Sequence, residues 1–131
     1  MKHFLADTHA LLFFFSQPDR LGKSARRAFE GLGSTSAIHV SSITLWEAAL
    51  LHEKGHVRLP AGYAAWSGAL GQEPGIAFEA LLAADIEEAR ALPHLADPFD
   101  RLIAGTALRL GVPLITKDER IKRGGRVRVI W

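Results

Sequence analysis

The sequence predicts a single α/β domain, residues 1–131, with a central parallel β-sheet, and three observations support this. Short apolar runs typical of strands alternate with segments whose apolar residues recur at helical spacing. Gly- and Pro-containing turns separate these segments, and no linker or internal repeat divides the chain. A chain of 131 residues can bury a substantial core. Strands alternating with helices favour a parallel sheet with right-handed crossovers.

The first half of the chain contains two expected strands, each followed by helices. The run at residues 3–6 ends at Asp7 and is typical of a short buried strand. Thr8 is expected to cap the next helix, because a threonine oxygen can accept a hydrogen bond from the first turn. The other expected elements are a helix from Ser24 to Gly33, a strand at 37–40, a helix capped by Ser41 or Ser42 and ending near Gly55, and a helix after Pro60.

The second half contains three further expected strands and two helices. A turn at 71–75 precedes a strand at 76–78 and an Ala- and Glu-rich helix at 83–91. Asp97 fits the N-cap of the next helix, Pro98 fits its first position, and Asp100 resembles the acidic partner of a capping box. Gly111 ends that helix, and strands are expected at 112–115 and 127–131.

Composition excludes several classes of site. The chain has no cysteine, so a disulfide, a thiolate nucleophile or a cysteine metal site is impossible. No stretch approaches the roughly 18 apolar residues of a membrane span, and the charge at Asp7 comes too early for a signal peptide. We therefore expect a cytoplasmic protein without a membrane partner. Basic residues gather near residues 20–27 and after 116, where they either attract a phosphate backbone or form a solvated face.

Four separated carboxylates are expected to meet at one edge of the sheet. Asp7 ends the first strand, and Asp118 follows the fourth. Asp100 lies in the first turn of the helix that leads to the fourth strand, and Glu47 lies in the helix after the second. Sites in open parallel sheets form outside the carboxyl ends of the strands. The sequence therefore places Asp7, Glu47, Asp100 and Asp118 in one candidate site.

An all-oxygen site of this kind favours Mg²⁺ or Mn²⁺ over zinc. Like charges at short range repel strongly unless a cation lies among them. A bound ion lowers the pKa of a coordinated water and binds phosphate oxygens, which suits hydrolysis of a phosphodiester.

Each of these residues also has a purely structural alternative. The alternatives are Asp7 and Asp97 as helix caps, Glu47 as a surface acid, Asp100 as a first-turn acid, Asp118 in a turn, His9 at a helix start, and Arg101 in an ion pair rather than on phosphate.

The ordered motifs resemble those of the PIN-domain nucleases, and within them the VapC-type toxins of prokaryotic toxin–antitoxin pairs. The resemblance covers nearly the whole chain. Two departures leave every carboxylate in place: Phe13 stands where many relatives have tryptophan, and Gly105 where alanine is usual. The motifs that carry the resemblance are LADTHALL at 5–12, SSITLWE at 41–47, DPFDRLIA at 97–104, LITKD at 114–118 and VRVIW at 127–131.

The resemblance implies a flavodoxin-like three-layer α/β/α sandwich and a Mg²⁺-dependent endoribonuclease toxin. It implies an RNA substrate, a homodimer and a small VapB-type antitoxin from the same operon. Asp7 and Asp100 are the first choices as direct metal ligands, Glu47 and Asp118 bind directly or through water, and Asp97 is an auxiliary acid. The supporting residues are Thr8, Thr116 and Arg101.

Three alternatives remain open from the sequence. The first is a PIN-type nuclease of RNA processing or DNA-end cleavage. The second is a phosphoacceptor signalling domain on a similar sheet, although this would leave Glu47 and Asp100 without a role. The third is a binding module without catalytic activity, in which the carboxylates would bind no metal.

Overall fold

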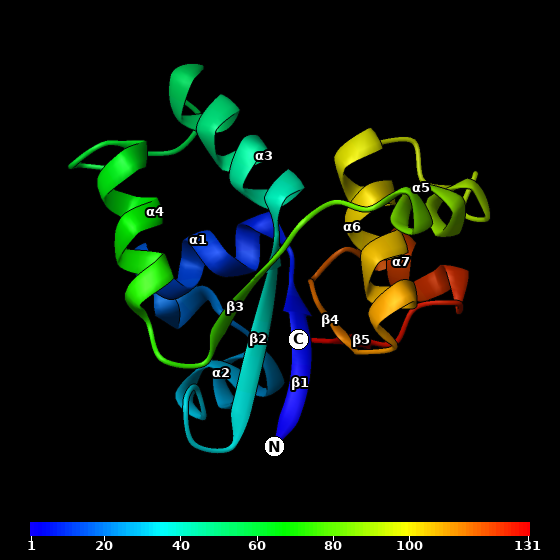
Figure 1. The fold of residues 1–131 in the computed structure, drawn as a ribbon, viewed down its shortest axis with the longest axis horizontal. Coiled ribbons are helices and arrows are strands. Elements are labelled where there is room, and N and C mark those ends of the chain that lie inside the picture. Colours follow the sequence, from blue (N-terminus) through cyan, green and yellow to red (C-terminus); the bar gives the residue numbers. More distant parts are fainter.

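A computed structural model describes residues 1–131, and it confirms a three-layer α/β/α arrangement around a five-stranded parallel sheet (Figure 1). The spatial order of the strands is β3-β2-β1-β4-β5. Every neighbouring pair is parallel, with Leu5 of β1 opposite His39 of β2 and Leu114 of β4. The strands are β1 (Lys2–Ala6), β2 (Ser36–Ser41), β3 (Ile76–Glu79), β4 (Leu114–Ile115) and β5 (Val129–Ile130).

Helices cover both faces of this sheet. In Figure 1 the helices α1 and α4 lie to the left of β1, α3 lies above the strands, and α5 to α7 lie to the right. None of the helices is long and apolar enough to cross a membrane. The helices are α1 (Thr8–Ser16), a 3₁₀ turn η1 (Pro18–Arg20), α2 (Lys23–Glu30), α3 (Ser42–Glu53), α4 (Tyr63–Gln72), α5 (Ala83–Arg90), α6 (Pro98–Leu110) and α7 (Glu119–Gly124).

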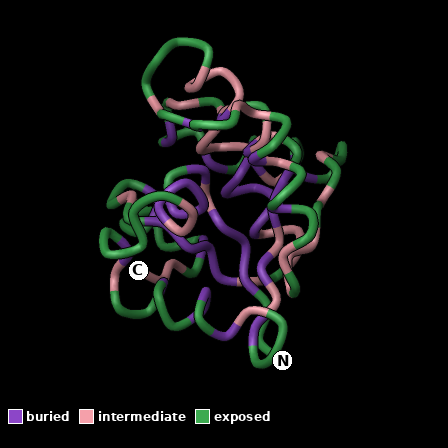
Figure 2. The backbone as a smooth tube through the Cα atoms, turned by 90° about the vertical axis from the view of Figure 1, so that its left-hand side faces the viewer, coloured by how far each residue is buried: buried purple, intermediate pink, exposed green.

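Strand alternation divides the interior into two cores, because successive side chains of a strand point to opposite faces. Phe4 and Ala6 of β1 belong to a core of 17 buried residues with α1 and α2. Leu5 belongs to a core of nine buried residues that includes Ile103 of α6 and Ile121 of α7. The buried segments run through the middle of the backbone trace in Figure 2. The sheet thus separates a larger core from a smaller one.

Helix caps agree with the expectation at two of three positions. Ser41 caps α3 by accepting a hydrogen bond from the Ile43 N–H, and Asp97 caps α6 by accepting one from the Asp100 N–H at 2.9 Å. The expectation that Thr8 caps α1 is wrong. Asp7 is the cap because its backbone is still extended, whereas Thr8 is already helical.

The C-terminal third differs from the expectation in two ways. β4 and β5 have only two residues each, shorter than the expected strands at 112–115 and 127–131. Pro113 has no N–H to donate to a ladder, so pairing begins at Leu114. The helix α7 was not expected, because Ile121 is its only buried residue and a helix with one apolar position has no detectable periodicity.

The helices α5 and α6 pack closely because α6 carries Gly105 at their contact. A Cβ atom at this position would lie 2.6 Å from the Asp85 carbonyl oxygen and 2.8 Å from the Ala89 backbone nitrogen. Such distances require the two helix backbones to separate. Gly105 therefore permits the approach of α5, which explains glycine where alanine is usual.

We expect Gly105→Ala to destabilise the fold by about 1–3 kcal/mol, the usual cost of overpacking, although alanine favours helix formation. Gly68→Ala in α4 is the matched control, since nothing lies within 4 Å of its Cβ position. This control should be stabilising by roughly 0.5–1 kcal/mol. Urea denaturation measures both values, and equal effects of the two substitutions would contradict the packing explanation.

Candidate active site

The site lies where the strand order reverses. From β1 the chain moves outward on one side through β2 to β3, and then places β4 and β5 on the other side of β1. In open parallel sheets a crevice forms at this point, outside the carboxyl ends of the two central strands. Asp7 directly follows β1 and Thr116 directly follows β4, so both lie at the reversal.

Asp7 is held in place by its role as the cap of α1. Its Oδ1 atom accepts a hydrogen bond from the Ala10 N–H at 2.8 Å. Burial raises the pKa of Asp7, although hydrogen bonds from the Thr116 hydroxyl and the Ala10 N–H and the charge of His9 partly offset the burial. Thr116 is fully buried, and its Oγ1 atom also accepts a hydrogen bond from the Asp118 N–H at 3.1 Å. Thr116 thus connects Asp7 to Asp118.

Glu47 is oriented by Thr8. The Thr8 Oγ1 atom donates a hydrogen bond to Glu47 Oε1 at 2.5 Å, which joins the first turn of α1 to α3. Burial is the largest cause that raises the pKa of Glu47, and the charges of Asp97 and Asp7 raise the pKa further. Glu47 is therefore half-buried with one oxygen fixed by Thr8, and it is not the freely exposed surface acid of the structural alternative.

Asp100 interacts electrostatically with all the other acidic residues of the site. Burial raises its pKa to about 7, and the next causes are the negative charges of Asp97, Asp118, Glu47 and Asp7. Its side chain nevertheless keeps 28% of its surface exposed. The structure therefore brings Asp7, Glu47, Asp97, Asp100 and Asp118 into one electrostatic group.

Asp118 differs from its neighbours because a cation accompanies it. Burial would raise the pKa of Asp118, but hydrogen bonds and charge from Arg120 outweigh burial and lower it. Asp118 caps α7 through the Arg120 N–H at 2.8 Å, and Arg120 Nη2 lies 3.3 Å from Asp118 Oδ2 and 4.0 Å from Asp100 Oδ2. Arg120 was not among the expected site residues; its one sequence signal is its position two residues after Asp118.

Arg101 lies next to Asp100 in sequence but contacts a different part of the fold. Its Nη2 and Nε atoms donate to the Ala89 carbonyl oxygen at 3.1 and 3.3 Å. This contact fastens α6 to the end of α5. No ion pair of Arg101 with a carboxylate is present.

The acidic group does not form a closed ligand set, since no three acidic or histidine side chains are arranged to hold a metal ion. The chemistry of the group still fits a hard divalent cation. All donors are carboxylate oxygens, and Asp100 has an elevated pKa partly because four like charges surround it and only one cation, Arg120 at 4.0 Å, lies close to it. A divalent ion would relieve this repulsion.

Comparisons with known proteins identify the family to which this chain belongs. The PIN domain family profile matches residues 4–127. Ribonuclease VapC22 of Mycobacterium tuberculosis is 30% identical over 142 aligned residues, which cover 100% of both chains.

Two solved structures resemble this fold. One is VapBC2 of Rickettsia felis bound to a promoter DNA fragment, with a TM-score of 0.72, 15% identity and coverage of 98% of this chain and 97% of that one. The other is a toxin–antitoxin complex of Klebsiella pneumoniae, with a TM-score of 0.65, 24% identity and coverage of 97% and 95%. The carboxylate positions, the sheet order and these matches together show that the chain belongs to the PIN-domain family, in its VapC-type group.

Proposed function

We propose that this chain is an endoribonuclease that requires Mg²⁺ or Mn²⁺ and acts as the toxin of a VapBC-type toxin–antitoxin pair. The observation that carries the proposal is the meeting of four carboxylates at the reversal of the sheet, two from the helices α3 and α6 and two from the N-caps of α1 and α7. The relative that covers the full chain is a ribonuclease, which supports RNA as the substrate class.

Asp7 and Asp100 are the first-choice metal ligands in this proposal. Both are held by the backbone, Asp7 as the cap of α1 and Asp100 in the first turn of α6. Glu47 and Asp118 complete the set, directly or through water, and Asp97 is primarily a cap. A bound divalent ion supplies a water of lowered pKa and neutralises charge on the phosphate.

The chain's own residues orient this set. Thr8 fixes one oxygen of Glu47, and Thr116 holds Asp7 and the backbone of Asp118. Arg120 offers a guanidinium at the rim, where it can neutralise negative charge on a substrate or on Asp118. Positioning of this kind matters because small displacements of reacting groups slow catalysis strongly.

The proposal includes two protein partners, a second copy of the chain and a small VapB-type antitoxin. Two solved relatives are described as a VapBC assembly and a toxin–antitoxin complex. Several large apolar side chains are exposed and available for such contacts, namely Trp46, Phe78, Leu82 and Ile86. Sedimentation with and without the product of an adjacent small open reading frame tests both partners.

Replacing a first-choice ligand should abolish cleavage without unfolding the chain. We expect Asp7→Asn and Asp100→Asn each to reduce the RNA cleavage rate by about 100-fold or more in Mg²⁺. Sequencing of RNA ends after brief expression, with gel assays on purified protein, measures this loss. Asparagine at position 7 keeps a cap oxygen for the Ala10 N–H, so circular dichroism should remain unchanged.

Asp97→Asn is the matched control for this experiment. Asparagine caps helices as well as aspartate, so α6 should remain intact. If Asp97 is mainly a cap, cleavage should fall by less than about fivefold, because only one neighbouring charge is removed. Undiminished cleavage by both Asp7→Asn and Asp100→Asn would contradict the proposal.

Removing the charge of Asp100 should stabilise the metal-free chain. The pKa of Asp100 rises from 3.8 to about 7 in the fold, so the folded chain binds more protons than the unfolded chain between these values. The contribution of Asp100 to stability therefore falls as the pH rises through this window and is at its least favourable above pH 7. At pH 8 in EDTA, Asp100→Asn should melt on the order of 5 °C above the wild type.

Mg²⁺ should reduce the difference in melting temperature between Asp100→Asn and the wild type. A ligand that binds only the folded state raises stability, so Mg²⁺ should raise the melting temperature of the wild type more than that of Asp100→Asn. Scanning fluorimetry in EDTA and in Mg²⁺ measures the four values. Equal melting temperatures of both proteins in EDTA would contradict the repulsion described at this site.

A further inference from the structure

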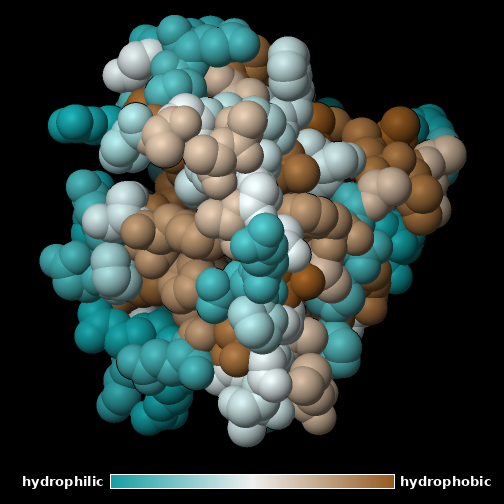
Figure 3. Space-filling model, turned by 60° about the vertical axis from the view of Figure 1, so that its left-hand side comes forward, coloured by the Kyte–Doolittle hydropathy of each residue, from teal (hydrophilic) through white to brown (hydrophobic).

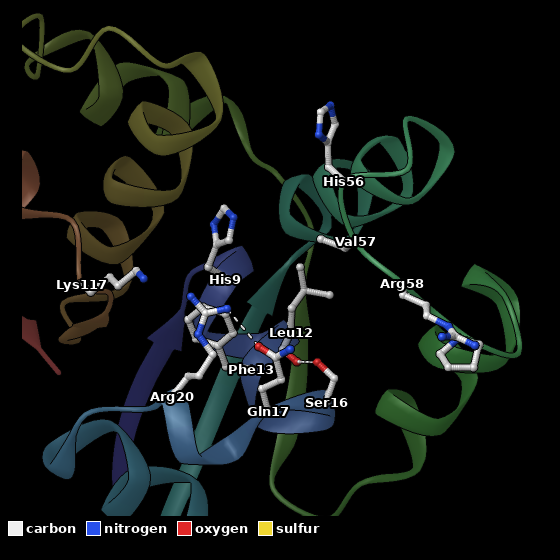
Figure 4. A pocket seen from close by; sticks show the side chains of 11 residues that line it. His9, Leu12, Phe13, Ser16, Gln17, Arg20, His56, Val57, Arg58 and Lys117 are labelled. Carbon is white, nitrogen blue, oxygen red and sulfur yellow. Dashed lines mark hydrogen bonds between the residues drawn. The ribbon is translucent and has the colours of Figure 1, made fainter.

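A basic cleft of about 710 Å³ opens beside the carboxylates, between α1 and the connection from α3 to α4 (Figure 4). His9 lines the cleft, and its charge also acts on Asp7 and Glu47. Lys117 lines the cleft and directly precedes Asp118. The cleft therefore lies directly beside the acidic group. None of its 11 lining residues carries a negative charge.

Three cations reach this cleft from separate parts of the chain. Arg20 comes from η1, Arg58 from the α3–α4 connection and Lys117 from the segment after β4 (Figure 4). None of them forms an ion pair with a carboxylate, in contrast to Arg109 and Arg120. Their positive charge is therefore not neutralised within the fold.

Phe13 holds two of these cations in place. The Arg20 guanidinium carbon lies 4.3 Å from the centre of the Phe13 ring, and Lys117 Nζ lies 5.2 Å from it. Both distances are within the range of cation–π attraction. Phe13 itself is buried and packs edge-on against Trp131. Gln17 further fixes Arg20, whose Nη1 donates to Gln17 Oε1 at 2.9 Å.

The lining distinguishes this cleft from the pocket beside it. The neighbouring pocket, of about 270 Å³, is mostly apolar, with Phe15, Leu59 and Trp66 in its walls. The cores of protein interfaces are depleted of charge, so an apolar pocket suits a protein side chain. Phosphate recognition requires the opposite lining, with cations and few apolar groups. Figure 3 shows the same contrast on this side of the molecule, where apolar surface is bordered by strongly hydrophilic side chains.

We propose that this cleft binds the single-stranded RNA segment adjacent to the cleaved phosphodiester. Arg20 and Lys117 contact a backbone phosphate at the end near the carboxylates, and Arg58 contacts another farther along the strand. Contacts to phosphate carry no base information, so the cleft positions the strand without selecting its sequence. The inference rests on the proposed nuclease function, because it takes the carboxylates as the cutting site.

Equilibrium binding without metal tests the cleft separately from cleavage. The probe is a short fluorescein-labelled single-stranded RNA of mixed sequence, titrated in EDTA at several salt concentrations and followed by fluorescence anisotropy. For single strands the slope of log affinity against log salt is about −0.7 for each phosphate contact. We expect Arg20→Gln and Arg58→Gln each to bind severalfold more weakly and to make the slope about 0.7 less negative.

Arg27→Gln is the matched control. Arg27 is also exposed and forms no ion pair, but it lines a different pocket together with Lys2 and Thr35, near the amino end of the sheet. Its substitution should change neither the affinity nor the slope beyond the general effect of net charge. Equal losses in all three variants, or no binding of RNA by the wild type, would overturn the proposal.

Undiminished RNA binding by both cleft variants would also overturn it and would assign these cations to a protein partner. RNA binding is measured independently of cleavage. A chain that binds RNA through the cleft but never cleaves it would refute only the proposed function. A chain that cuts RNA with unchanged salt slopes in the variants refutes the cleft alone.

The role of Phe13 gives a second measurement. Phe13→Leu removes the aromatic face but keeps an apolar side chain, so RNA affinity should fall severalfold although neither cation has been replaced. Phe13→Trp offers a stronger cation–π partner and should retain binding. Thermal melts identify a variant that fails to fold. Wild-type affinity of a folded Phe13→Leu chain would show that the ring does not position the cations.

Discussion

Parallel pairing of β1 with both β2 and β4 is the constraint on which the site depends. Because the strands point in one direction, the helices that follow them begin at the same edge of the sheet. The N-cap positions of α1, α3 and α7 therefore lie together, and aspartates occupy two of them, Asp7 and Asp118. The caps that start the helices thus also supply part of the candidate site.

This arrangement concentrates charge that the fold does not neutralise. Asp100 combines partial burial with four negative neighbours, and only Arg120 lies close enough to form an ion pair with it. On the adjacent surface, Arg20 and Arg58 are positive without carboxylate partners. A separation of charge into neighbouring acidic and basic regions leaves both available to bind other molecules, a cation on one side and a polyanion on the other.

Much of the fold could be predicted from the sequence because the signals for strands, helices and turns are local. Helical periodicity and turn residues identified the order of strands and helices, and Asp97-Pro98 marked the start of α6. The features that could not be predicted depend on tertiary contacts or lack a pattern. The helix α7 has one buried apolar residue, and the approach of Arg20 and Arg58 across a cleft depends on the fold of two distant segments.

The division of the interior into two cores has a consequence for how the site is maintained. Asp7 and Glu47 belong to helices that pack into the core of 17 buried residues, whereas Asp100 and Asp118 belong to helices anchored in the core of nine. The second core contacts the sheet through Leu5 of β1 and Leu114 of β4, and β4 and β5 have only two residues each. Local opening is easiest where few buried contacts must break, so amide hydrogens of α7, in which only Ile121 is buried, should exchange before those of β1 and β2. Such an opening would separate Asp118, the cap of α7, from the other three carboxylates while most of the chain stays folded.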